Sequence, residues 1–597
     1  MNDYFEEEEF ESQINKDTIW RIAKLGFRHW PLMAGFLIFI SLVAGVEAYH
    51  TYLSKQMIDL GIVAGDMEAL KHYALIYLAT WPIFALFVLG FILCAGWLGH
   101  QVQYDLRQSM FAHLQELSLS YYDKTPTGWL MSRATSDVSR VGDLVSWGFL
   151  DMTWTLTSVT ASLFFMFLIN WKMTLIVIAI IPVLYIVAVN FKQYILVEYR
   201  AVRKVNSKIT GAFSENISGV RVVKSLRREE KNISDFQELT DEMYGAGFKA
   251  AWLSALFLPA VQLVSAMAIA IVVWFSGLQY EAGTMTIGSI HAFVAYITFM
   301  LWPVQQLAAV YASMQQAVAS GERIFSLLDT EVEIVDADDA IDPGTVRGDI
   351  TFDHVQFSYV ADKPVLTDFN LTIPQGETVA LVGPTGAGKS TIVNLLCRFY
   401  EPTGGTVRFN GRDYRTMTQA SIQSRVGMVL QTPHLFSGTA MENFRYGRLS
   451  ATDEEVIAAA KMAGAHEFIM KLEDGYQTQV GEGGVLLSTG QKQLISLARA
   501  IMADPDIFIM DEATSSVDTL TEALIQKGMD VLMEGRTSFI IAHRLSTIKN
   551  ADRILVIEGG GISEMGSHAE LIQQRGHYYN LYTRQFREEA EGRLTVS

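Results

Sequence analysis

Residues 379–396 read VALVGPTGAGKSTIVNLL, and this stretch decides the fold of the C-terminal half of the chain. The pattern GxxxxGK[ST] stands at residues 383–390, after an apolar strand and before a helical run, which is the context that a P-loop requires. Its glycines let backbone N–H groups converge on phosphate oxygens at a helix N-terminus. Strand patterns at residues 349–355, 377–382, 507–511 and 538–542 alternate with helical ones. Together they predict an α/β domain that binds nucleotide phosphates.

The predicted phosphate site continues at a second strand end. Residues 507–510 are apolar and are followed by Asp511 and Glu512. An aspartate there holds a metal ion, directly or through water, and a neighbouring glutamate polarises the attacking water. Lys389 is expected to reach the β- and γ-phosphates, and the Ser390 hydroxyl to ligate Mg²⁺. The expected phosphate cradle comprises Gly383, Pro384, Thr385, Gly386, Ala387, Gly388, Lys389, Ser390 and Thr391.

The first half of the chain carries six long apolar segments. They stand near residues 32–52, 73–97, 147–169, 173–191, 252–275 and 287–307. Each is close to the roughly 20 residues that cross a bilayer as a helix. The predicted fold class is therefore a membrane α-helical domain of six transmembrane helices fused to an α/β P-loop ATPase domain. Lysines and arginines crowd the loops after the second and fourth segments, which places the N-terminus, both loops and the ATPase domain in the cytosol.

Composition excludes several other classes of protein. The formal net charge of −18 argues against a nucleic-acid binder, and the two cysteines exclude a disulfide framework. The N-terminal residues DYFEEEEFE have the wrong charge for a cleavable signal. Three domains are expected. Residues 1–29 form an acidic tail and an interfacial helix, and residues 30–328 form the membrane domain with long helical cytosolic loops. Residues 329–597 form the ATPase domain, which begins with an acidic linker.

Five further motifs make the C-terminal domain specific. They are FSY at 357–359, VLQTPHLFSGT at 429–439, LSTGQ at 487–491, SSVD at 515–518 and IIAHRLST at 540–547. With the P-loop, they follow the order and spacing of the nucleotide-binding domain of ABC transporters, which this domain resembles. The resemblance implies ATP and Mg²⁺ as ligands, with Tyr359 stacked on adenine. It also implies that Glu512, His543 and Gln431 are catalytic, and that Ser390, Gln431 and Asp511 hold the metal.

The membrane half resembles the exporter type of this family. The residues that carry this likeness are Tyr122-Asp123, Gly128, Ser132-Arg133 and Asp137 for a first coupling loop, and Glu215–Gly219 for a second. Val480–Gly484 resembles an exporter segment that touches those loops, with Gly483 where the family usually has arginine. The resemblance thus covers nearly the whole chain and implies transport by alternating access.

One chain of this type is expected to be half of a dimer. In the family, the signature of one subunit closes over the ATP held by the other, so Ser488, Gly490 and Gln491, with Asp518 of the next motif, are implied nucleotide contacts. Thr489 stands where the usual LSGGQ has its first glycine, and a Cβ there restricts both the approach to phosphate and the backbone angles. A chain that combines an altered signature with an intact catalytic glutamate, here Glu512, resembles one subunit of the bacterial heterodimeric multidrug exporters. We expect a heterodimer, with a homodimer that tolerates threonine as the alternative.

The transported compound is the least determined feature. Polar residues within the spans are Glu47, His50, Asp151, Asn190, Gln262, Gln305 and Gln306. Glu47 and Asp151 would attract a cationic substrate, or would serve as hydrogen-bonding residues between helices. The expected function is ATP-driven export of small amphiphilic compounds or drugs through the bilayer of the cytoplasmic membrane. The alternatives are a homodimeric lipid flippase and an ATP-gated channel or sensor.

Overall fold

The computed structural model describes residues 16–481, 487–511, 518–542 and 545–583. Contacts divide this chain into two compact units. The first contains the chain up to Glu116 and Pro126–Thr330, and the second contains Leu117–Thr125 and the chain from Glu331 onwards. The short segment Leu117–Thr125 therefore leaves the first unit in sequence and packs with the second.

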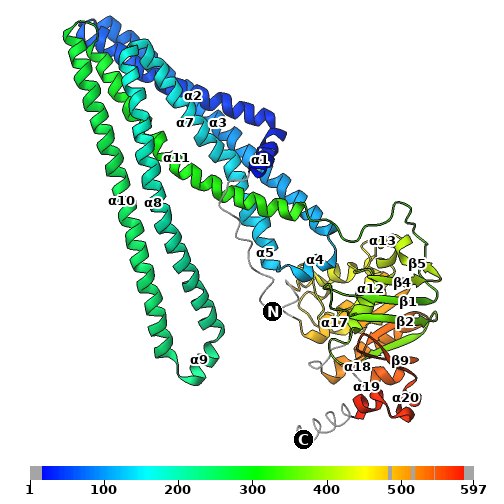
Figure 1. Cartoon of the computed structure of the whole chain (residues 1–597). Helices are drawn as coiled ribbons and strands as arrows, with labels where there is room; N and C mark the ends of the chain where they lie inside the picture. The colour runs from blue at the N-terminus through cyan, green and yellow to red at the C-terminus, as the bar shows by residue number, and fades with distance from the viewer. Residues whose placement is uncertain (1–15, 482–486, 512–517, 543–544, 584–597) are drawn as a thin grey trace. The chain divides into compact units, whose positions relative to one another are not determined.

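The first unit is entirely helical within the described residues (Figure 1). Its long helices are α2 (Trp30–Gln56), α3 (Met67–Glu116), α7 (Phe149–Ile169), α8 (Trp171–Ser218), α10 (Glu229–Glu281) and α11 (Ile287–Leu328). Shorter elements are α1 (Lys16–Arg28), η1 (Met57–Val63), α5 (Thr127–Ser132), η2 (Arg133–Asp137), α6 (Val138–Asp143), η3 (Leu144–Gly148) and α9 (Val220–Leu226).

Each of the six predicted spans lies within one of these long helices or its direct continuation. Four helical stretches among the described residues are long and apolar enough to cross a membrane, namely Trp30–Val63, Met67–Glu116, Thr127–Ile169 and Glu229–Glu281. The span in α11 is represented by the shorter apolar stretch Ile287–Met300, and α8 is helical through residues 173–191. At 50, 48 and 53 residues, α3, α8 and α10 exceed the roughly 20 residues that a bilayer needs. The predicted continuation of the spans as helices is thus confirmed.

Helices α8 and α10 run side by side as a hairpin with α9 at its tip (Figure 1). Asn170 caps the start of α8, because its side chain accepts hydrogen bonds from the backbone of Lys172 and Met173. Each helix of the hairpin contains one proline, Pro182 in α8 and Pro259 in α10. Proline removes a backbone hydrogen bond from a helix interior, so each helix is weakened at that point.

Polar contacts join the ends of the helices in the first unit. Asp59 of η1 accepts a 2.6 Å hydrogen bond from Thr286 and a 2.7 Å bond from the backbone N–H of Gly288, at the start of α11. At the other end of α11, Arg323 donates two hydrogen bonds of 2.8 and 2.6 Å to Asp137, which is 2% exposed. Asp137 belongs to the predicted first coupling loop, so this buried pair holds that loop against α11.

Within the described residues, the second unit contains two sheets. The larger has the order β10-β9-β3-β8-β7-β6, in which every pair except β10–β9 is parallel. Its strands are β3 (Thr378–Val382), β6 (Val426–Val429), β7 (Ile507–Asp511), β8 (Thr537–Ile541), β9 (Arg553–Glu558) and β10 (Gly561–Gly566). The smaller sheet is antiparallel, in the order β2-β1-β4-β5, with β1 (Ile350–Phe357), β2 (Leu366–Ile373), β4 (Gly404–Phe409) and β5 (Arg412–Asp413).

Buried apolar clusters lie on both faces of the larger sheet. The α-helices of this unit that follow β3 in the described residues are α12 (Lys389–Leu396), α13 (Gln419–Gln423), α14 (Ala440–Arg445), α15 (Asp453–Met462), α16 (His466–Ile469), α17 (Thr489–Ala503), α18 (Thr519–Met533), α19 (Leu545–Asn550) and α20 (His568–Gln574). The helix α4 (Leu119–Lys124) joins this unit from the segment between α3 and α5, and single turns stand at η4 (Tyr414–Thr416) and η5 (Gly475–Gln477).

The central strand β3 shows why this sheet needs two covered faces. Val379 and Leu381 belong to one buried apolar cluster, and Ala380 and Val382 to the other. Side chains alternate between the faces of a strand, so a continuous apolar run requires cover on both sides, as in parallel sheets. The predicted α/β domain is therefore present, with strand ends shifted by a residue or two from the predicted ones.

Candidate functional site

The P-loop connects the end of β3 to the start of α12. Gly383, Gly386 and Gly388 have φ angles of 151°, 83° and 106°, a region that side chains other than glycine rarely adopt. A Cβ at Gly383 would lie 2.2 Å from the carbonyl oxygen of Ile557 in β9. At Gly383 the loop therefore passes too close to β9 for any side chain.

Lys389, the first residue of α12, points back over this loop. Its buried Nζ donates hydrogen bonds of 2.7 and 2.9 Å to the carbonyl oxygens of Gly383 and Pro384. Burial lowers the pKa of this ammonium group, and the charge of Asp511 opposes that effect. A cation held in the bend of a glycine-rich loop at a helix N-terminus fits the phosphates of a nucleotide.

The predicted metal ligands lie at the same edge of the sheet. Asp511 ends β7, Gln431 follows β6, and Ser390 belongs to the first turn of α12 behind β3. These are carboxyl ends of parallel strands, where ligands bind in open α/β sheets. No group of three or more His, Cys, Asp and Glu residues in the described ranges could hold a metal ion. One carboxylate with hydroxyl, amide and phosphate oxygens still suits Mg²⁺, which keeps several non-protein ligands.

Tyr359, the predicted adenine contact, stands beside α12. Its hydroxyl lies 3.2 Å from Oγ1 of Thr391 and accepts a 3.3 Å hydrogen bond from Nδ2 of Asn394. Its ring packs edge-on against Phe357 and Tyr400, with centroids 4.7 and 5.0 Å away. The side chain is 37% exposed, so an aromatic surface is available for a flat base next to the phosphate loop.

The signature residues form the start of α17. Ser488 caps this helix, because its Oγ accepts a bond from the backbone of Gln491 and the Gln491 side chain accepts one from the backbone of Ser488. Thr489 is exposed at the first helical position, and its φ angle is not positive. The helix therefore needs no glycine conformation at this residue, and Thr489 fits it without strain. The steric part of the expectation concerns the partner's nucleotide and stays a prediction.

Asp518, the predicted nucleotide contact of the SSVD motif, stands directly before α18. Asp518 caps α18 by accepting a 3.0 Å hydrogen bond from the backbone of Thr521, and the bonds to Thr521 lower its pKa. Its structural role as a helix cap is therefore explicit. Glu512 and His543 lie outside the described residues, as do the residues 482–484 of the predicted exporter segment.

The structure adds two residues that sequence reasoning missed. Arg398, which is 2% exposed, donates to Asp336, Glu401 and the carbonyl of Met417 and so fixes the linker to the ATPase domain. Tyr400 donates a 2.5 Å hydrogen bond to Asp123 of α4. Both follow the P-loop helix directly in the run CRFYEP, and that position was the only signal that the sequence offered.

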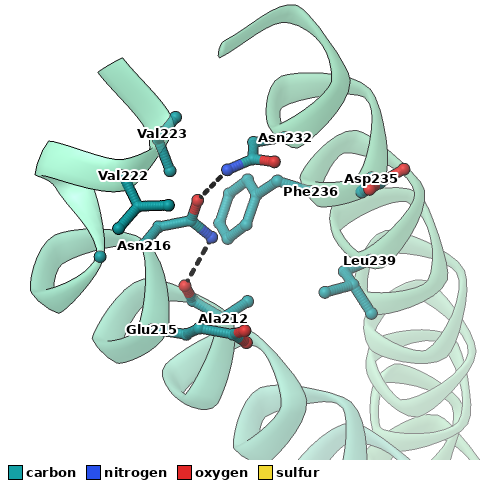
Figure 2. Close-up of a pocket in the computed structure, with 10 residues that line it drawn as sticks. Ala212, Glu215, Asn216, Val222, Val223, Asn232, Asp235, Phe236 and Leu239 are labelled. Carbon is teal, nitrogen blue, oxygen red and sulfur yellow. Dashed lines mark hydrogen bonds between the residues drawn. The ribbon is translucent and has the colours of Figure 1, made fainter. Parts of the chain in front are cut away.

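A pocket lies at the tip of the α8–α10 hairpin, at the predicted second coupling loop (Figure 2). Its volume is about 450 Å³, and Asn216, one of the lining residues, forms two hydrogen bonds there. Nδ2 of Asn216 donates to the carbonyl of Ala212 at 2.8 Å, and Oδ1 accepts from Asn232 at 2.5 Å. These bonds connect α8 to α10 across the pocket and give the tip a defined shape.

Comparisons with known proteins agree with both halves of this description. The family described as the ABC transporter transmembrane region matches residues 33–304, and the family described as ABC transporter matches residues 366–515. The ATP-dependent lipid A-core flippase of Syntrophus aciditrophicus is 33% identical over 589 residues, covering 98% of this chain and 97% of the flippase. The fatty acid ABC transporter ATP-binding/permease protein of Mycobacterium bovis is 40% identical over 476 residues, covering 80% of this chain and 75% of that protein.

A solved structure of a bacterial Atm1-family ABC exporter with ATP bound has the same fold, with a TM-score of 0.77 and 28% sequence identity. The match covers 93% of this chain and 98% of that one. ATP with Mg²⁺ is the ligand of the matched ATPase domain, and exporters of this kind work as dimers in a lipid bilayer. With one membrane domain, one ATPase domain and relatives along almost its entire length, the chain belongs to the ABC exporters as a half-transporter that couples ATP hydrolysis to transport.

Proposed function

We propose that this chain exports amphiphilic compounds or drugs across the cytoplasmic membrane, as one half of a heterodimer. Its N-terminus and ATPase domain lie in the cytosol, and its domains are 1–29, 30–328 and 329–597. The observation that carries the heterodimer is Thr489, which stands exposed at the start of α17 beside otherwise intact family motifs.

This chain would supply all the residues that bind ATP at its own P-loop and that hydrolyse it. The cradle 383–391 with Lys389 would hold the phosphates, and Tyr359 would stack on adenine. Ser390, Gln431 and Asp511 would hold Mg²⁺, Glu512 would polarise the attacking water, and His543 would position it with Gln431. The convergence of the P-loop, Gln431 and Asp511 at one edge of the sheet supports this assignment.

The second ATP site, in which the signature of this chain would close over the ATP bound by the partner, would hydrolyse ATP less well. The N–H groups at the start of α17 form an anion site, with Ser488, Gly490 and Gln491 around them and Asp518 in the following segment. The Thr489 side chain adds bulk at that helix end, where close approach of a phosphate needs bare backbone. We infer that the ATP contacted by this signature stays bound and is hydrolysed slowly.

Two observations favour an amphiphilic substrate. The relatives named above are a lipid A-core flippase and a fatty acid transporter, and both of those compounds are amphiphiles. In the membrane half, Glu47 accepts a hydrogen bond from Trp154 while its Oε2 has no hydrogen-bond partner among the described residues. This buried acceptor oxygen would suit a cationic or neutral group that donates a hydrogen bond better than a lipid phosphate.

The second candidate is a homodimeric lipid flippase, which the name of the Syntrophus relative favours. The two candidates differ in subunit composition and in the compound that stimulates ATP hydrolysis. The chain should be purified from cells that lack neighbouring half-transporters, and its mass and ATPase activity measured in lipid nanodiscs. A homodimer that transports at full rate in inverted vesicles would refute the heterodimer, and stimulation by lipids alone would favour the flippase.

A further inference from the structure

The pocket at the tip of the α8–α10 hairpin has the size of a small-molecule site, at about 450 Å³ (Figure 2). Three helices form its walls. The lining residues are Ala212, Glu215 and Asn216 of α8, Gly219, Val222 and Val223 at α9, and Asn232, Asp235, Phe236 and Leu239 of α10. All of them belong to the first unit, so the pocket lies within one compact part of the chain.

The backbone turns sharply on both sides of α9 and thereby encloses the pocket. Gly219 follows α8 directly, its N–H donates a 2.8 Å hydrogen bond to the carbonyl of Glu215, and a Cβ there would lie 2.9 Å from that oxygen. After α9, Arg227 takes a left-handed conformation with a φ angle of 51°, from which the chain enters α10. The bond from Asn232 to Asn216 joins two of the walls, so the pocket is formed before any ligand binds.

The charged groups of the lining are both acidic. They are the carboxylates of Glu215 and Asp235, and the described residues that line the pocket include no lysine, arginine or histidine. The lysine of α9, Lys224, pairs with Glu229 at 3.0 Å instead. Neither Glu215 nor Asp235 forms an ion pair with any residue that the structure describes. A cation that enters the pocket would therefore meet two carboxylates without competing against a basic side chain.

The remaining surface of the pocket is largely apolar. Val223, Phe236 and Leu239 line it and are half-buried. The ring of Phe236 packs edge-on against Phe213 of α8, with centroids 4.7 Å apart, and this contact fixes an aromatic ring in the wall. An aromatic ring attracts a nearby cation, and apolar side chains remove a hydrocarbon group from water. The lining thus combines negative charge with a surface for an apolar body.

We propose that this pocket is a binding site for an organic amine, whose ammonium group pairs with Glu215 and Asp235. The apolar body of the amine would lie against Val223, Phe236 and Leu239. An inorganic cation lacks that body, and an anion or a hydrocarbon chain lacks the positive charge. The amine would hold α9 together with α8 and α10. The proposal rests neither on the exported compound nor on the ATP site, because the pocket contains residues of neither.

Two probes of similar shape and different charge test the proposal. They are 4-phenylbutylamine and 4-phenyl-1-butanol, added to the full transporter in nanodiscs at neutral pH. The readout is hydrogen–deuterium exchange of the peptides that cover residues 212–239, so that probe dissolved in the bilayer is not counted. The amine should slow this exchange and reach half-saturation at a concentration at least about tenfold below that of the alcohol, since charge-assisted hydrogen bonds are the stronger ones.

Three variants locate the site, and their nucleotide affinity is measured on the same samples to show that each is folded. Glu215→Gln with Asp235→Asn keeps the shape of the lining and removes both charges, so the amine should bind at least about tenfold more weakly. The matched control, Glu238→Gln with Asp241→Asn, removes the same charge from α10 outside the pocket and should change amine affinity less than about threefold. Leu239→Trp fills the pocket and should abolish slowing by both probes.

The comparison of the two probes in the wild type needs no variant and can refute the proposal alone. Equal half-saturation by amine and alcohol, or no slowing by millimolar amine, overturns it. Slowing that survives both in the variant without the two charges and in Leu239→Trp places the amine elsewhere in the transporter and also overturns it. An equal loss of affinity in the matched control would show a general effect of negative charge and no site. The expected pattern in a transporter that exports no amphiphile supports the site and refutes only the proposed function.

Discussion

Loss of the Asp137 carboxylate should destabilise the membrane half by about 2–3 kcal/mol. Asp137 is 2% exposed and accepts bonds from Arg323 at 2.8 and 2.6 Å and from Ser320 at 2.9 Å. Removing one partner of a buried ion pair costs about 3–5 kcal/mol. Because the Arg323 side chain is 25% exposed and can reach water, we expect about 2–3 kcal/mol for Asp137→Ala.

The assay is unfolding by sodium dodecyl sulfate in mixed micelles, followed by tryptophan fluorescence. A double-mutant cycle with Arg323→Met isolates the pair, and its coupling free energy should exceed about 1.5 kcal/mol. The matched control is Glu242→Ala, which removes an exposed ion pair with Lys208 between α8 and α10, worth at most about 1 kcal/mol. The reasoning is refuted if Asp137→Ala costs no more than Glu242→Ala, or if the cycle shows no coupling.

Three other predictions concern the ATP site. Lys389→Ala should weaken nucleotide binding by roughly 10- to 100-fold, since it removes a charge-assisted bond, and unchanged affinity in a fluorescent-ATP titration would contradict the phosphate role. Glu512→Gln should nearly abolish ATP turnover while ATP binding persists; retained turnover in a coupled assay would assign the base elsewhere. Burial lowers the pKa of Lys389, so its positive charge is present below that pKa and is lost as pH rises through it. Nucleotide affinity of the wild type should therefore begin to fall at a lower pH than an exposed lysine would allow, and Lys389→Arg should not show this fall.

Local patterns predicted most of the fold. The P-loop, its strand and its helix came from one continuous stretch, because the motif and its flanking periodicity are all encoded within 379–396. The six spans could be located for the same reason, since length and hydropathy are properties of each segment alone. The departure of Thr489 from the family signature is visible in the sequence, whereas its helical conformation at the start of α17 is seen only in the structure.

Contacts between distant residues could not be predicted in the same way. The bond from Tyr400 to Asp123 joins residues 277 positions apart, and neither belongs to a motif that requires the other. The placement of Leu117–Thr125 in the second unit depends on such contacts with Glu333 and Ile334. Glu512 and His543 are supported by sequence alone, since they fall outside the described residues.

The two prolines of the α8–α10 hairpin have a mechanical consequence. From Pro259 to the start of α10 at Glu229 is about 45 Å of helix at 1.5 Å per residue, and from Pro182 to Ser218 about 54 Å. A bend of about 5° at these weakened points would carry the tip by roughly 4 Å, which is more than a hydrogen bond can stretch. The hairpin is thus a lever whose weakened points lie within the predicted spans, and a small rotation there would displace α9 by more than the length of a hydrogen bond.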